Sequence, residues 1–184
     1  MRSVRGRAID TGRAIDNARA IDKARAIAFV SAALLAAPAG ANGLVTVKQL
    51  APETALKAAK AALDYCRGKG YQVGVAVVDR AGLPQVFLRD RFAGAHTVEM
   101  ATNKAWTAAS LRTATMAIAA ETQPGRPMSG IRHLPRVIAA GGGLPIEAGG
   151  TMVGGIGVSG APSGDADADC ATAGVKAIEA DIEF

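Results

Sequence analysis

The sequence predicts an α+β fold, a small α-β-α domain in which helices flank an antiparallel sheet. Its 184 residues fit one globular domain. Strand-forming segments occur in two pairs with short glycine-containing turns, and helical segments stand before, between and after the pairs. Because hairpins join antiparallel strands without long crossovers, this order favours an antiparallel sheet with helices packed on it.

The first 41 residues are predicted to form a leader that is separate from the domain at 42–184. The tetrapeptide RAID begins at Arg7, Arg13 and Arg19, and this six-residue period fits neither a helix nor a strand. The apolar stretch AIAFVSAALLAAPAGA then has the length of a signal-peptide core and is shorter than the ~20 residues of a membrane span. With AGA at 39–41 as a cleavage site, we expect a low-complexity segment and signal peptide, a periplasmic or secreted protein, and no stable membrane span; the true translation start stays open.

The domain is expected to begin with a helix over residues 54–66 and a β-hairpin. Apolar residues recur at helical spacing in the helix, which Pro52 precedes and Gly68 follows, as is typical of helix ends. A β-rich segment at 71–79, the turn RAGLP and a second strand at 85–89 form the hairpin.

Two further helices, a second pair of strands and a closing helix are expected to follow. The breaker-rich segment TQPGRPMSG separates the helices from the strands. The predicted helices are 96–111 and 113–121, the predicted strand segments are 137–140, 144–147 and 151–158, and the closing helix runs from about 165 to 180.

The charge distribution argues against a nucleic-acid partner. The chain carries a net charge of +5, but residues 1–41 hold 7 Lys/Arg and 3 Asp/Glu, which leaves 14 and 13 in residues 42–184. A nucleic-acid-binding domain should carry its basic patch on the folded body, together with aromatic side chains that stack on bases. The near-neutral, aromatic-poor body therefore excludes that class.

The two cysteines leave two interpretations open. Cys66 and Cys170 lie in separate predicted helices, so they are either a disulfide of an oxidising compartment or two free, buried thiols. A zinc site is not predicted, because no pair of Cys or His has a zinc-ligand spacing.

The helix predicted over residues 96–111 carries the strongest chemical signal. Its polar and sulfur-containing side chains share an arc of about 100°, and Lys104 lies near the edge of this arc, where it could meet a carboxylate. A mixture of imidazole, thioether, hydroxyl and amide suits axial coordination of a flat metal macrocycle. The alternative is a solvated polar face that begins at an N-cap, Thr97. The side chains in the arc are His96, Glu99, Met100, Asn103, Thr107 and Ser110.

A second group of candidates, Arg132, His133 and Arg136, lies in a predicted loop. Guanidinium groups could hold carboxylates or propionates in bidentate fashion, or could simply solvate a turn.

Two familiar motifs are not interpreted as sites. The G-x-G-x-x-G match at 155–160 lacks the following chain that a dinucleotide-binding βαβ unit needs, and it is expected to be strand and turn. Asp165, Asp167 and Asp169 imitate a calcium loop but are followed by Cys170 where that loop needs glycine, so they are interpreted as acids at a helix N-terminus.

Six segments, in this order and spacing, resemble the GlcG/HbpS family of haem-binding proteins. The resemblance implies a small α-β-α domain with an antiparallel sheet of profilin-like type, a homo-oligomer, and binding of haem or a related tetrapyrrole. A C-terminal domain of some PduO-type cobalamin adenosyltransferases is similar to the same fold. The segments are AVVDRAG (76–82), FLRDRFAGAHT (87–97), NKAWTAASLRT (103–113), SGIRHLPRV (129–137), AAGGGLPI (139–146) and VGGIGVSGAPSGDADADCA (153–171).

The family segment KA-x-TA is matched at 104–108, so the resemblance strengthens Lys104 and Thr107 as candidates. The metal-ligand candidates are His96 and Thr107. The cofactor-binding candidates are His96, Met100, Asn103, Lys104, Thr107, Arg132 and His133.

We therefore expect an exported haem-binding protein that serves in haem capture, sensing or protection. One alternative is an enzyme that acts on a small organic acid or on haem itself, with Lys104, Arg132 and His133 around the ligand. Another is an assembly protein whose glycine-rich strands allow close subunit packing.

Overall fold

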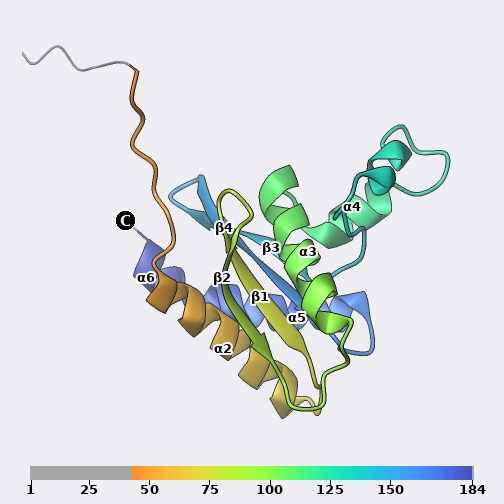
Figure 1. Cartoon of the computed structure of the whole chain (residues 1–184), viewed down its shortest axis with the longest axis horizontal. Coiled ribbons are helices and arrows are strands. Elements are labelled where there is room, and N and C mark those ends of the chain that lie inside the picture. The colour runs from red at the N-terminus through yellow and green to blue at the C-terminus, as the bar shows by residue number, and fades with distance from the viewer. Residues whose placement is uncertain (1–42, 184) are drawn as a thin grey trace, which may run out of the picture. The chain divides into compact units, whose positions relative to one another are not determined.

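A computed structural model describes residues 43–183 of the chain, which form five α-helices and one 3-10 turn around one sheet (Figure 1). The predicted leader at 1–41 lies outside the described residues. The elements in order are α2 (Pro52–Gly68), β1 (Gly74–Asp79), β2 (Pro84–Arg89), α3 (Thr97–Leu111), α4 (Thr115–Glu121), the 3-10 turn η1 (Ser129–His133), β3 (Gly143–Ala148), β4 (Thr151–Ser159), α5 (Gly164–Lys176) and α6 (Glu179–Ile182).

The four strands form one antiparallel sheet in the order β2-β1-β4-β3. Each outer strand pairs with its hairpin partner, and the central strands β1 and β4 pair over their length from Gly74 opposite Ser159 to Asp79 opposite Gly154. The predicted fold class, an antiparallel sheet flanked by helices, is confirmed.

Helices cover both faces of the sheet, and side-chain alternation along β1 assigns its residues to the two faces. Val75 and Val77 pack with α2 and α5 in the larger core, whereas Ala76 and Val78 pack with α3 in the smaller one. All four side chains are fully buried. Figure 1 shows the resulting three layers, with α2 and α5 on one side of the sheet and α3 on the other.

Glycines on β3 and β4 let α3 lie directly on the backbone of the sheet. A Cβ atom on Gly157 would lie 2.1 Å from the carbonyl oxygen of Ala101, and one on Gly155 would lie 2.7 Å from that of Ala105. On β3, a Cβ atom on Gly143 would lie 2.5 Å from the carbonyl oxygen of Lys104. Real Cβ atoms do not approach so closely, so the glycines set the distance between helix and sheet.

The structure corrects the sequence prediction most clearly in three places. Residues 137–140 are not a strand, because the Thr107 hydroxyl, rather than a neighbouring strand, accepts a hydrogen bond from the backbone N–H of Ile138 at 3.0 Å. The predicted closing helix is two helices, α5 and α6, which are separated at residues 177–178, where Ile178 is fully buried in the larger core. The first strand begins at Gly74 rather than at residue 71.

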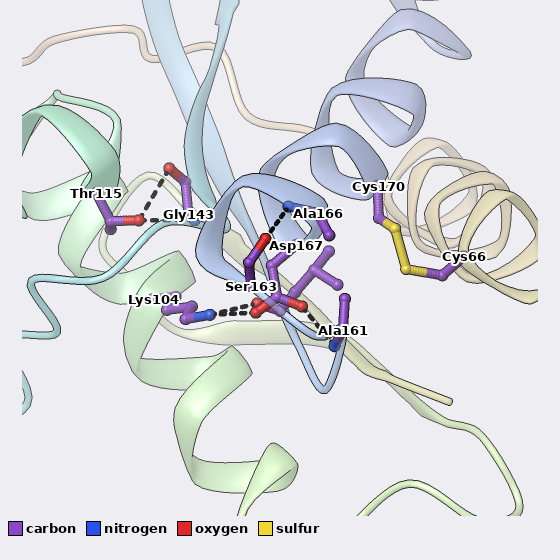
Figure 2. Close-up of polar contacts among 10 residues, drawn as sticks. Cys66, Lys104, Thr115, Gly143, Ala161, Ser163, Ala166, Asp167 and Cys170 are labelled. Atoms are coloured by element: carbon purple, nitrogen blue, oxygen red, sulfur yellow. Dashed lines mark hydrogen bonds and ion pairs between the residues drawn. A yellow bond between two sulfur atoms is a disulfide. The ribbon is translucent and has the colours of Figure 1, made fainter. Parts of the chain in front are cut away.

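The cysteines form a disulfide, which decides between the two interpretations (Figure 2). Cys66 of α2 and Cys170 of α5 are both fully buried, with a Cα–Cα distance of 5.6 Å. The bond closes a loop with a sequence separation of 104 residues. Constraining the unfolded chain over such a loop typically stabilises a fold by about 2–4 kcal/mol. The covalent link therefore fixes the two helices of one face to each other.

None of the helices within residues 43–183 is both long and apolar enough to cross a membrane.

The substitution Gly157→Ala should lower the free energy of unfolding by roughly 3 kcal/mol, because α3 must move away from β4 to admit one methyl group. Urea denaturation followed by circular dichroism measures the change. Gly68→Ala is the matched control, since a Cβ atom there meets nothing within 4 Å and alanine favours the helix end of α2. Equal stability of the two variants would contradict the close-packing interpretation.

Candidate functional site

An open cleft of about 620 Å³ lies along the first half of α3, opposite the loop that joins β4 to α5. A volume of this size is within the ordinary range of small-molecule sites. Its walls come from five parts of the chain: residues 70–72, the loop before α3, α3 itself, Ala140, and residues 159–167. The side chains that matter for its chemistry are Tyr71, Phe92, His96, Met100, Lys104 and Asp167.

His96 and Met100 stand one helical turn apart on the wall of this cleft. His96 is the N-cap residue of α3 and is exposed; its ring lies back against Gly94, where a Cβ atom would be 2.7 Å from the ring carbon Cε1. Met100 is half-buried. An imidazole and a thioether are thus presented side by side to the same space.

The loop that carries Phe92 and His96 is held at both of its ends. Asp90 is 1% exposed, and Arg67 donates to both of its carboxylate oxygens, from Nε at 2.7 Å and from a terminal nitrogen at 3.0 Å. These hydrogen bonds lower the pKa of Asp90 despite its burial. At the other end, the Thr97 hydroxyl donates to the Gly94 carbonyl at 2.7 Å. The loop is therefore an anchored platform, although Phe92 on it is 79% exposed.

The floor of the cleft holds a buried ion pair between α3 and α5 (Figure 2). The Lys104 ammonium donates to Oδ2 of Asp167 at 2.6 Å and to the carbonyl oxygen of Val158 at 3.0 Å. The side chains of Lys104 and Asp167 are 3% and 6% exposed. Burial raises the pKa of Asp167, and the hydrogen bond and charge of Lys104 offset part of that rise.

The same pair shapes the loop opposite α3. The second carboxylate oxygen of Asp167 accepts from the backbone N–H of Ala161 at 2.9 Å, and the Ser163 hydroxyl caps α5 by accepting from the Ala166 N–H at 3.1 Å. Lys104 holds the end of β4, and Asp167 holds the loop after it. One wall of the cleft is thus tied to the other through a single ion pair.

Comparison with known proteins identifies the family. Residues 50–176 match the family described as haem degrading protein HbpS-like. The chain belongs to the HbpS-like family. A curated relative is the corrinoid adenosyltransferase PduO of Salmonella typhimurium, which is 35% identical over 121 residues. That match covers 65% of this chain but only 36% of PduO, so the chain spans about a third of the length of this relative.

Two solved structures share the fold. A double mutant of Streptomyces reticuli HbpS is 39% identical, with a TM-score of 0.70 over 77% of this chain and 96% of that one. The complex named PduOC:Heme is 32% identical, with a TM-score of 0.68 over 71% of this chain and 96% of that one. The predicted family resemblance is confirmed.

The structure divides the candidates of this HbpS-like chain between the cleft and other places. His96, Met100 and Lys104 line the cleft. Lys104, however, was expected at the edge of the polar arc, ready for a ligand carboxylate, and that placement is wrong: the ammonium is buried and meets Asp167 of the protein itself. The sequence does contain a pattern that indicates this burial. Lys104 lies three residues after Ala101 and four before Ala108, which places the lysine on the buried side of α3.

Thr107 is fully buried, outside the residues that line the cleft. Its hydroxyl donates to the Arg136 carbonyl at 3.2 Å and accepts from the Ile138 N–H, so it is bonded to the segment after η1 rather than presented to a metal. Asn103 is half-buried, and its Oδ1 accepts from Nε of Arg136 at 3.2 Å. The polar arc is therefore split into a cleft end and an end that holds a loop.

Arg132 and His133 lie on η1, away from the residues of the cleft. The Arg132 guanidinium donates to the carbonyl oxygens of Thr122 and Ala119, at 2.7 and 2.9 Å, so it satisfies the last turn of α4. His133 is exposed. Tyr71 and Phe92 belong to no periodic pattern that predicts a site, and Asp167 was assigned to a helix N-terminus, so none of the three was predicted to line a cleft.

Substitution of Lys104 should lower the free energy of unfolding much more than substitution of an exposed lysine. Lys104→Met leaves a buried carboxylate without its counter-charge and should lower the free energy of unfolding by about 3–5 kcal/mol. Lys60→Met, which removes an exposed ion pair with Asp64, should cost less than about 1 kcal/mol. The double variant Lys104→Met/Asp167→Asn should lose less than the sum of its two single variants in urea denaturation.

The pH dependence of Lys104→Met provides a second readout of the same prediction. Burial already raises the pKa of Asp167, so without Lys104 the native state binds more protons than the unfolded state. The penalty is then present at neutral pH, shrinks as the pH falls, and is smallest below about pH 4, where the carboxyl becomes protonated in both states. A penalty that stays constant with pH, together with additive single variants, would refute the ion-pair interpretation.

Proposed function

We propose that this protein is an exported haem-binding protein whose tetrapyrrole lies in the cleft along α3. The observation that carries the proposal is the pairing of the His96 imidazole with the Met100 thioether in one cleft of about 620 Å³. Imidazole nitrogen and thioether sulfur are both established ligands of haem iron in proteins. Capture, sensing and protection of haem are the roles that such binding would serve.

The remaining residues of the cleft fit a flat, largely apolar ligand. Phe92 and Tyr71 line it with aromatic side chains, and the loop that carries Phe92 is anchored through Asp90. Gln72 lines the same cleft, and its Oε1 is buried without a protein hydrogen-bond partner among the described residues. Bound haem would supply the iron chemistry; the chain's own residues would ligate, orient and enclose it.

The relatives support this proposal. The matched family is described as haem degrading, and a similar solved structure is a complex named PduOC:Heme. The adenosyltransferase activity of PduO is not carried over here, since this chain spans only about a third of PduO. Self-association into a homo-oligomer remains a prediction from the family resemblance.

Titration of the purified protein with haemin should shift and sharpen the Soret band. His96→Ala should weaken binding at least tenfold, because the variant removes the exposed imidazole of the cleft. Met100→Leu should keep most of the affinity but change the absorption spectrum. His133→Ala is the matched control, since it removes the other histidine of the chain, which lies outside the cleft, and it should bind as the wild type does.

Cobalamin serves as a second probe in the same experiment. Binding of cobalamin but not haemin would overturn the proposal, as would equal losses in His96→Ala and His133→Ala. Progressive bleaching of the bound haem with added peroxide would extend the function from binding to degradation.

Export is the part of the proposal that concerns location. It is supported by the signal-peptide pattern before residue 42 and by the disulfide between Cys66 and Cys170, since such bonds persist in oxidising compartments. The same bond would not be expected in a reducing cytosol.

Expression of the full chain should therefore yield protein in the periplasm or medium in which neither cysteine reacts with an alkylating agent. A variant that begins at residue 42 should stay in the cytosol and carry two reactive thiols after denaturation, measured as mass added by alkylation. Retention of the full chain in the cytosol with reduced cysteines would contradict export.

A further inference from the structure

Arg136 adopts a backbone conformation that arginine rarely takes. Its φ angle is 72°, in the left-handed region, where a side chain costs energy that glycine would not. Strained residues of this kind persist only where the surroundings hold them, and they are frequent at ligand sites. The contacts of Arg136 show which group this strained conformation positions.

The backbone of Arg136 is held by α3. The Thr107 hydroxyl donates to the carbonyl oxygen of Arg136 at 3.2 Å and accepts from the N–H of Ile138 at 3.0 Å. Thr107 itself is fully buried, so these two hydrogen bonds anchor the segment to the core. The buried threonine thus keeps residue 136 in its unusual conformation.

The side chain of Arg136 is held as well. Its guanidinium lies over the ring of Trp106, 4.7 Å from the ring centre, and Nε donates to Oδ1 of Asn103 at 3.2 Å. Trp106 is braced in turn, because a Cβ atom on Gly82 of the β1–β2 turn would lie 2.5 Å from its ring. Two contacts from α3, one of them braced by the β1–β2 turn, therefore fix this guanidinium group.

The charge of this guanidinium is not neutralised within the described chain. Arg136 is exposed, and among residues 43–183 it forms no ion pair with an acidic side chain. With Nε occupied by Asn103, the two terminal nitrogens form a planar fork that matches a carboxylate. The guanidinium is thus fixed in position, stacked on an aromatic ring and not paired with an acidic side chain. This arrangement is suited to binding a carboxylate.

The position of the group connects it to the cleft. Met100 and Asn103 are three residues apart on the same face of α3, and His96 lies seven residues before Asn103. At 1.5 Å per residue, Asn103 stands about 10 Å along the helix from His96. A macrocycle held by His96 and lying along this face would direct its acidic side chains toward Arg136.

We propose that Arg136, stacked on Trp106 and held by Asn103 and Thr107, binds a carboxylate side chain of the tetrapyrrole in the cleft. This inference rests on the proposed haem-binding function and names the residue that selects an acidic tetrapyrrole over its neutral form. Arg136 acts as a binding residue for the periphery of the ligand and not for its metal.

The test compares haemin with haemin dimethyl ester, whose carboxylates are blocked. Wild-type protein should bind haemin about tenfold more tightly than the ester, as expected for one charge-assisted hydrogen-bonded pair. Arg136→Gln should bind both compounds with affinities that agree within about twofold, with the Soret position unchanged because the iron ligand is untouched. Quenching of the fluorescence of Trp106, the only tryptophan in the chain, gives an independent measure of binding.

Two further variants separate this role from a structural one. Arg136→Gly removes the side chain and relieves the left-handed strain, so it should equal or exceed the wild type in urea midpoint while losing the preference for haemin. Arg126→Gln removes an exposed arginine that pairs with Glu121, and it should keep the full preference.

The outcomes separate this inference from the proposed function. If the wild type binds neither compound, haem binding itself fails. If it binds both equally, or if Arg136→Gly keeps the preference for haemin, haem binding stands and the role of Arg136 is refuted. Saturable binding of a free dicarboxylate such as succinate at Arg136, with no effect of haemin on it, would also overturn the inference, since the carboxylate would then come from a separate ligand.

Discussion

The close approach of α3 to the glycine-lined strands is the constraint on which the rest of the structure depends. With no side chains at Gly143, Gly155 and Gly157 between helix and sheet, the carbonyl groups of α3 come within contact distance of the strands. At that distance the Lys104 side chain can reach the end of β4 and the carboxylate of Asp167 beyond it. These three glycines therefore set the position of the Lys104–Asp167 ion pair in the cleft as well as the packing of α3 on the sheet.

The ion pair gives the cleft two walls that cannot move independently. A buried lysine and aspartate are weak evidence of stability as such, because desolvation offsets their attraction. Their geometric effect is more informative: Lys104 fixes the end of β4, and Asp167 fixes Ala161 in the loop that follows. The disulfide on the other face of the sheet and the Arg67–Asp90 ion pair also restrict the movement of the elements that they join. A rigid site loses little conformational entropy when a ligand binds.

Local sequence patterns predicted most of the fold correctly. The errors lie at residues whose contacts come from distant parts of the sequence. Helical spacing and hairpin turns located the sheet and its helices, because those patterns record which side chains face the core. Residues 137–140 look like a strand, but a buried hydroxyl on α3 accepts a hydrogen bond from the backbone N–H of Ile138 in place of a neighbouring strand. Lys104 and Asp167 are 63 positions apart, so no window of sequence could pair them. His96 and Met100 were found because one helical turn joins them.

The polar arc of α3 is divided into two parts with different surroundings, and the structure shows why one helix can carry both. Its first part, at His96 and Met100, faces open space, whereas Asn103 and Thr107 in its second part bind the segment that carries Arg136. A continuous polar stripe on a helical wheel hides this division, because the wheel does not record what lies opposite each turn. The loop after η1 covers the second part and replaces solvent with a guanidinium group. A cofactor lying along α3 would thus meet neutral ligand atoms at one end and a positive charge at the other, which would favour a ligand with a metal at its centre and acids at its edge.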